Sequence, residues 1–237
     1  MTPAPHSVGP APGLRRALGL ALGVLLPVFA VLVVRAPTDS VQGVIQKILY
    51  VHPACAFAAY AGFTLTALGG ALYLWRGDER WDQLAAAAAE VGVVFCTLNI
   101  LTGPVWAKGT WGHWWSWDPR LVVTLVLWFI YLAYGLLRSF TEGDERAARF
   151  AAVYGIVGLA AVPLNYVAIQ LFGGRALHPE NLERGSLGAG MGVPFLMGVV
   201  TLLVAFAWLL LVRLDVGVMR AELARRSRGA PAGSVAR

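Results

Sequence analysis

Six long apolar stretches most constrain what this chain can fold into. A helix needs about 20 apolar residues to cross the hydrocarbon core of a membrane, and each stretch approaches or exceeds that length. Only 14% of the residues are charged and 58% are apolar, whereas roughly a quarter are charged in soluble domains. The sequence therefore predicts an all-α polytopic membrane protein, a bundle of six transmembrane helices. The expected spans are Leu14–Val34, Pro53–Trp75, Leu84–Val105, Leu121–Leu137, Phe150–Phe172 and Met191–Leu211.

The distribution of Lys and Arg around these spans predicts how the bundle is oriented. Basic residues are more frequent on the side that carries the two termini, with the densest group following Arg213. The positive-inside rule then places both termini in the cytoplasm. If the source is a Gram-negative bacterium, the membrane is the bacterial inner membrane. The segment between the third and fourth spans consequently faces the outer, periplasmic side.

The chain is expected to form one transmembrane domain followed by a tail. Arg15 and Arg16 precede the first span as they would in a signal peptide, but the apolar run is long and Pro37 follows Ala36, so a retained helix is favoured. Residues 1–215 are therefore assigned to the six-helix domain. Residues 216–237 are basic and rich in small residues, which is typical of a disordered cytoplasmic tail at an anionic leaflet.

Tryptophans crowd the segment of residues 106–120, between the third and fourth spans. Tryptophans at a membrane boundary usually form an interfacial belt. This group is denser than a belt requires, and it is interleaved with glycine and followed by Asp118 and Arg120. Flat indoles offer apolar area for a macrocycle and an N–H for its polar edge. The crowded residues are Trp106, Trp111, Trp114, Trp115 and Trp117.

Two histidines are expected on the same outer side as the tryptophans. His52 and His178 each precede a proline, the first before the second span and the other between the fifth and sixth spans. A following proline favours an extended backbone, so His52 is predicted to be extended. Two imidazoles are too few for a closed zinc site but suffice for the two axial positions of a haem. A boundary histidine bonded to a backbone carbonyl is the simpler alternative for each.

Further polar residues have less specific roles. Arg120 is the first candidate to bind the haem propionates, because guanidinium pairs well with carboxylates. Asp118 is interpreted as a scaffold acceptor for an indole N–H or for Arg120, and His113 as a third ligand or an edge contact. Glu90 and Asn99, in the third span, are interpreted as polar contacts between helices in preference to a proton path. The other propionate candidates are Lys108, Arg175 and Arg184.

The run WGHWWSWDPRL, from Trp111 to Leu121, resembles the WWD signature of haem-handling membrane proteins of cytochrome c biogenesis. The CcmC, CcmF and CcsA-type families share this signature, and a chain of this length with six spans is similar to the CcmC family. The resemblance implies that haem b is a transiently bound cargo, with His52 and His178 as its two axial ligands. It implies that Trp111, Trp114, Trp115, Trp117, Asp118 and Arg120 hold the haem.

The same resemblance implies partners and the absence of enzymatic activity. Haem would pass to a periplasmic chaperone of the CcmE type that engages the tryptophan-rich segment. The family works with the ABC-type subunits CcmA and CcmB and a small CcmD-like helper. The sequence has no GxxxxGK[ST] phosphate loop, so ATP hydrolysis by such a loop would require another subunit.

Three other functions remain open from the sequence. A haem permease would need polar groups along the spans, which are few. An electron-transfer cytochrome b would place its histidine ligands deep in the helices. A cytochrome c synthase would be expected to have a longer chain.

Overall fold

The computed structural model describes residues 12–140, 144–172, 178 and 187–229. Six helical segments in this part of the chain are long and apolar enough to cross a membrane, which confirms the predicted all-α bundle. A short 3₁₀ helix precedes the second of them. The helices are α1 (Pro12–Arg35), η1 (Val44–Tyr50), α2 (His52–Arg76), α3 (Glu79–Trp111), α4 (Pro119–Phe140), α5 (Glu145–Gly158), α6 (Ala161–Phe172) and α7 (Gly192–Gly229).

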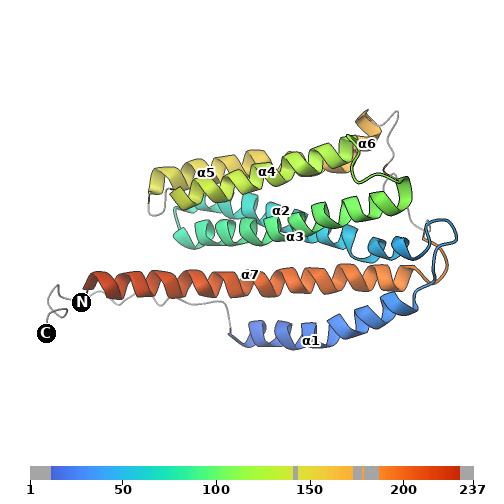
Figure 1. Ribbon diagram of the computed structural model, residues 1–237. Helices are drawn as coiled ribbons and strands as arrows, with labels where there is room; N and C mark the ends of the chain where they lie inside the picture. The colour runs from blue at the N-terminus through green and yellow to red at the C-terminus, as the bar shows by residue number, and fades with distance from the viewer. Residues whose placement is uncertain (1–11, 141–143, 173–177, 179–186, 230–237) are drawn as a thin grey trace, which may run out of the picture.

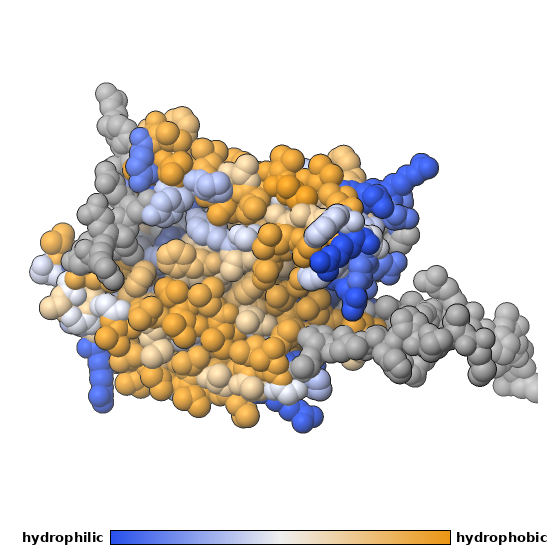
Figure 2. Space-filling model, turned by 180° about the vertical axis from the view of Figure 1, so that it is seen from behind, coloured by the Kyte–Doolittle hydropathy of each residue, from blue (hydrophilic) through white to orange (hydrophobic). Residues whose placement is uncertain are grey.

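The helices pack in layers that lie almost parallel to one another (Figure 1). Helices α2 and α3 form the middle of the bundle, with α4, α5 and α6 on one side and α7 on the other. Helix α1 is outermost and packs on α7. On the face shown in Figure 2, hydrophobic residues form a broad band over the middle of the surface and the most hydrophilic residues gather toward the two ends. This pattern is the one that a surrounding bilayer requires.

The fifth span consists of two helices, whereas the sequence predicted one. Helix α5 ends at Gly158 and α6 begins at Ala161. Pro163 has no backbone N–H and so cannot donate to the carbonyl of Leu159, four residues earlier. In a regular helix its ring would also clash with that carbonyl. The chain turns at Leu159 and Ala160 instead, so the break lies where the proline predicts a distortion.

Two other helices extend beyond their predicted bounds. Helix α3 continues to Trp111, past the expected end at Val105, so Trp106 and Trp111 are helical residues and only residues 112–118 connect α3 to α4. Helix α7 continues to Gly229. The first part of the 216–237 segment is therefore helical, and residues 230–237 lie outside the described residues.

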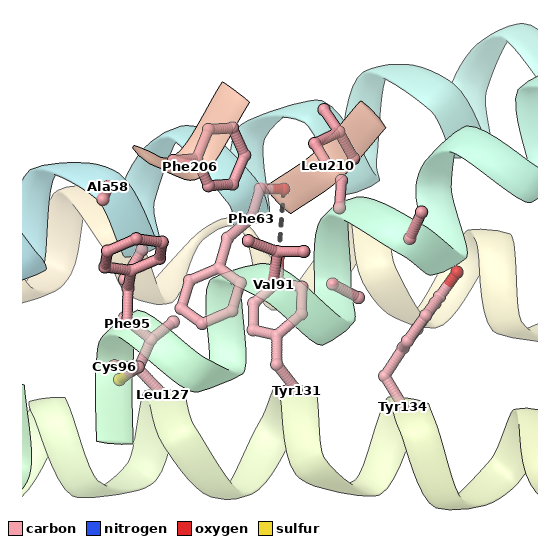
Figure 3. Packing of buried hydrophobic residues seen from close by; sticks show 14 of the residues in the cluster. Ala58, Phe63, Val91, Phe95, Cys96, Leu127, Tyr131, Tyr134, Phe206 and Leu210 are labelled. Carbon is pink, nitrogen blue, oxygen red and sulfur yellow. Dashed lines mark hydrogen bonds between the residues drawn. The ribbon is translucent and has the colours of Figure 1, made fainter. Parts of the chain in front are cut away.

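The centre of the bundle is filled by close packing between α2, α3 and α4 (Figure 3). Phe63 stacks on Tyr131 with ring centroids 3.8 Å apart, and Leu127 is completely buried beside them. A Cβ on Gly62 would lie 2.7 Å from the Cα of Gly92. Glycine at position 62 thus lets the backbones of α2 and α3 approach each other.

Charged residues join helices toward the end of the bundle at which α1 begins and α7 ends. Arg138 makes two hydrogen bonds with Asp82, at 2.5 and 2.7 Å, and joins α4 to α3. Glu90, expected to make a polar contact between helices, pairs with Arg213 of α7. Cys55 and Cys96 are buried free cysteines, as small hydrophobic residues in the core would be.

Candidate functional site

His52 is the first residue of α2 and its ring contacts one face of α3. Helix α2 begins at the end of the bundle opposite the one at which α1 begins and α7 ends (Figure 1). The backbone of the preceding Val51 is in the right-handed helical region and its N–H donates to the carbonyl of Ile48. His52 itself is the first residue of the helix, so the prediction that the following proline gives it an extended backbone is wrong. A proline in the first turn of a helix needs no N–H partner, so η1 leads almost directly into α2.

Three side chains of α3 surround the imidazole of His52. Its Nδ1 is 2.9 Å from the Thr102 hydroxyl. The amide of Asn99 donates to the backbone carbonyl of His52 at 2.9 Å and lies 3.3 and 3.4 Å from the two ring nitrogens. Trp106 meets the ring edge-on, with centroids 5.8 Å apart. Positions 99, 102 and 106 share one face of a helix because they are three and four residues apart.

The segment before η1 holds Trp106 in place. The Trp106 indole N–H donates to the side-chain oxygen of Gln42 at 2.9 Å. The carboxylate of Asp39 accepts from the backbone N–H groups of Gln42 and Val41. These bonds, chiefly the one from Gln42, hold the pKa of Asp39 below its ordinary value, so the carboxylate is charged and the turn is closed at neutral pH.

His178 is held by the residues that follow the tryptophan cluster. Its backbone N–H donates to the Asp118 carboxylate at 3.2 Å, and its Nδ1 is 3.4 Å from the Arg120 guanidinium. Its ring meets Trp111 edge-on, with centroids 6.4 Å apart. Both histidines therefore lie beside the final turns of α3, His52 against Trp106 and His178 against Trp111.

A buried polar network lies beside this site. Asn165 of α6 donates to the backbone carbonyl of Arg120 at 3.1 Å and to the Thr124 hydroxyl at 2.8 Å. It accepts from the Tyr60 hydroxyl of α2 at 2.5 Å. The Arg120 guanidinium also donates to the carbonyl of Tyr166 at 3.1 Å. The network joins α2, α4 and α6 and fixes the start of α4, from which Asp118 and Arg120 reach His178.

The tryptophans divide into helical and loop residues. Trp106 and Trp111 belong to α3 and contact the two histidines. Trp114 and Trp117, in the loop, are 59% and 80% exposed. Trp115 is partly buried and meets Trp117 edge-on. The indoles of an interfacial belt are expected to lie among lipid headgroups. Trp106 and Trp111 instead contact His52 and His178, the two candidate ligands.

The remaining predicted site residues are placed differently. The Lys108 ammonium donates to the carbonyl of Gly112 at 2.7 Å and so satisfies the end of α3. The Nδ1 of His113 is 3.0 Å from the carbonyl of Trp111. Arg175 and Arg184 lie outside the described residues. Of the two basic candidates that the structure describes, Arg120 has its guanidinium beside a predicted ligand and Lys108 does not.

The donor set suits a haem better than a bare metal ion. Among the described residues, no three His, Cys, Asp or Glu side chains gather into a metal site. Two imidazoles can complete the coordination of an iron whose porphyrin supplies four nitrogens. The buried Trp115 Nε1 and Ser116 Oγ atoms make no hydrogen bond. Such donors, next to exposed indoles, fit a flat ligand with a polar edge.

Sequence reasoning missed Thr102 and Gln42 and gave Asn99 only a general role. A threonine or amide in a membrane helix has many possible partners, and its spacing within one helix does not reveal which helix lies opposite. The nearest signal was the spacing of Asn99, Thr102 and Trp106 along one face. That pattern alone does not point to His52.

Comparison with known proteins gives consistent matches over most of the chain. The family model for CcmC, heme exporter protein C, matches residues 12–229. Heme exporter protein C of Bradyrhizobium diazoefficiens is 33% identical over 195 residues, which are 81% of this chain and 72% of the relative. The protein of the same name from Escherichia coli K12 is 31% identical over 186 residues, 76% and 73% of the two chains. That from Haemophilus influenzae is 29% identical over 196 residues, 80% and 78% of the two chains.

Proposed function

The chain belongs to the CcmC family of heme exporter protein C, and on that premise we propose that it binds haem at the periplasmic face of the bacterial inner membrane. It then transfers the haem to a periplasmic chaperone of the CcmE type during the biogenesis of c-type cytochromes. In this proposal haem is a cargo and not a resident cofactor, and the protein carries it without catalysing a reaction.

The observation that carries the proposal is the convergence of His52 and His178 beside the final turns of α3. The two side chains come from positions far apart in the chain, and each is in edge contact with a tryptophan of that helix. We assign them as the axial ligands of haem b. Haem supplies a flat apolar surface and two propionates, and indoles with a nearby guanidinium complement both.

The loop of residues 112–118 supports a role in transfer. Trp114 and Trp117 are largely exposed, and large exposed indoles are typical of surfaces that bind a partner. We propose that this loop covers the haem, with Trp111, Trp115, Asp118 and Arg120, and meets the chaperone. Arg120 would receive a propionate because its guanidinium lies at the His178 side of the site.

We further propose that the protein acts as one subunit of a larger complex. Its sequence has no phosphate-binding loop, so the energy of ATP would enter through CcmA- and CcmB-like subunits, with a CcmD-like helper. The end with the termini would face the cytoplasm, and the basic segment 216–237 would lie at the anionic leaflet.

A haem permease is less well supported. The space between helices α2, α3, α4 and α5 is filled by the stacked rings of Phe63 and Tyr131 and by Leu127. The exposed indoles and the histidines lie at one end of the described bundle and not along it. A path for haem through the bundle would require these packed side chains to separate.

The absorption spectrum of the purified protein tests this proposal. We expect the wild type to carry a low-spin haem with two nitrogen ligands, and His52→Ala and His178→Ala to lose that spectrum. His113→Ala serves as a matched control and should keep it. A wild type without haem, or two ligand variants with unchanged spectra, would overturn the assignment.

Transfer needs a second measurement. Haem-loaded protein in lipid nanodiscs is mixed with an apo-chaperone of the CcmE type, and the haem on each protein is measured after separation. We expect transfer to the chaperone, and slower transfer from Trp117→Ala. Retention of haem by the wild type would favour an electron-transfer cytochrome b instead.

A further inference from the structure

We propose that Thr102 is a positioning residue that fixes the tautomer of His52 and so presents its Nε2 as the iron-binding nitrogen. The inference rests on the proposed haem-binding function. It specifies which nitrogen of His52 binds the iron and which side chain orients that ring. It concerns a residue of α3 that contacts the ligand and not the haem.

The direction of the hydrogen bonds at Thr102 defines the tautomer. The hydroxyl donates to the backbone carbonyl of Leu98 at 2.8 Å, with the carbonyl of Asn99 at 3.1 Å. A carbonyl oxygen can only accept, so the single hydroxyl proton is used there. The Thr102 oxygen must then accept at its 2.9 Å contact with His52 Nδ1. The proton of the neutral imidazole is therefore on Nδ1, and the lone pair is on Nε2.

Asn99 and Gly103 fix the plane of the same ring. The Asn99 amide nitrogen is almost equally distant from both ring nitrogens. An atom at these distances in the plane of the ring would collide with Cε1, so the amide lies over the ring face. It therefore does not occupy the in-plane lone pair of Nε2. A Cβ on Gly103 would lie 3.2 Å from Cε1. The ring thus fits closely against α3, and a larger residue at 103 would displace it.

This arrangement has a chemical consequence for bound iron. Histidines that bind metals usually donate their other N–H to an oxygen, which orients the ring and makes it a stronger ligand. A stronger ligand favours ferric iron and lowers the reduction potential of the haem. Removing the acceptor at Thr102 should therefore weaken haem binding and raise the potential.

The experiment compares two threonine-to-valine variants of α3. Thr102→Val keeps the shape of the side chain and removes the acceptor for His52. Thr97→Val is the matched control, because Thr97 also donates to the carbonyl four residues earlier, at 2.8 Å, and accepts from a ring N–H, that of Trp128, at 2.8 Å. Both variants lose the same kind of hydrogen bond in the same helix.

The readouts are the rate at which haem leaves to an apo-globin acceptor and the reduction potential of the bound haem. For Thr102→Val we expect about tenfold faster release, the lower end of such effects on metal affinity, and a more positive potential. Thr97→Val and Thr102→Ser should stay near wild type, the latter because serine restores the acceptor.

The outcomes separate this inference from the proposed function. If Thr102→Val matches Thr97→Val in both readouts while His52→Ala loses haem, the positioning role is wrong and the haem site stands. If the wild type carries no haem, or His52→Ala keeps the wild-type spectrum, the proposed function fails and this inference fails with it.

Discussion

The indole of Trp106 joins the segment after α1 to the candidate site, because its N–H donates to the side-chain oxygen of Gln42 at 2.9 Å. The same indole meets the His52 ring edge-on. A contact between the loop before η1 and the end of α3 therefore reaches the proposed haem ligand through a single side chain.

This relationship predicts non-additive effects of two variants. Gln42→Ala and Trp106→Phe each remove the same hydrogen bond, worth about 1 kcal/mol, and each should speed haem release by a few fold. The double variant should be little worse than Trp106→Phe alone, because the bond is lost only once. Release rates of the three variants measure the coupling, and effects that simply add would contradict it.

The two histidines are predicted to differ in how strongly they retain haem. A guanidinium can only donate, so the Arg120 contact at 3.4 Å makes His178 Nδ1 an acceptor and places the proton of the neutral ring on Nε2. His178 must rearrange before its Nε2 binds iron, whereas His52 need not. We expect His178→Ala to retain more haem than His52→Ala, measured as haem per protein after purification. Equal retention would show that the two ligands are equivalent.

Asn165 should be important for stability as well as for the site. Asn165→Leu keeps the volume but leaves the partly buried Tyr60 hydroxyl without its acceptor, at a cost of about 1–3 kcal/mol. Tyr60→Phe in the same chain removes the unpaired hydroxyl and should recover part of that loss. Unfolding of the three variants in detergent checks this, and a double variant less stable than Asn165→Leu would argue against it.

The close approach of α2 and α3 predicts a position-specific effect of one methyl group. Gly62→Ala would place a Cβ 2.7 Å from the Cα of Gly92, and separating the helices should cost about 1–3 kcal/mol. Gly135→Ala is the control, since nothing lies within 4 Å of a Cβ there. Thermal unfolding of both variants measures the difference, and equal stability would mean that the helices do not touch as described.

The proposed orientation can be tested by labelling cysteines from one side of the membrane. Cys55 and Cys96 are 1% and 2% exposed, so background labelling should be low. In spheroplasts, an impermeant maleimide should label Trp117→Cys but label Glu79→Cys only after lysis. Both positions are exposed, at opposite ends of the bundle. The reverse pattern would place the tryptophan loop in the cytoplasm.

Local patterns predicted much of this architecture correctly. Apolar length determines where a helix can span a membrane, so all six spans were found from the sequence. Helix ends were less accurate, because α3 continues through Trp111 and α7 through Gly229. Polar residues near a membrane surface can remain helical, and hydropathy does not mark where such a helix stops.

The sequence by itself determined that this chain is a six-helix membrane protein with two histidines and a dense tryptophan cluster expected at one end. The tertiary structure decided which side chains accompany those histidines. The contacts of His52 with Asn99, Thr102 and Trp106 depend on the register of α2 against α3, and close packing at Gly62 is part of what sets that register. Register is a property of two surfaces packed together, and neither helix specifies it alone.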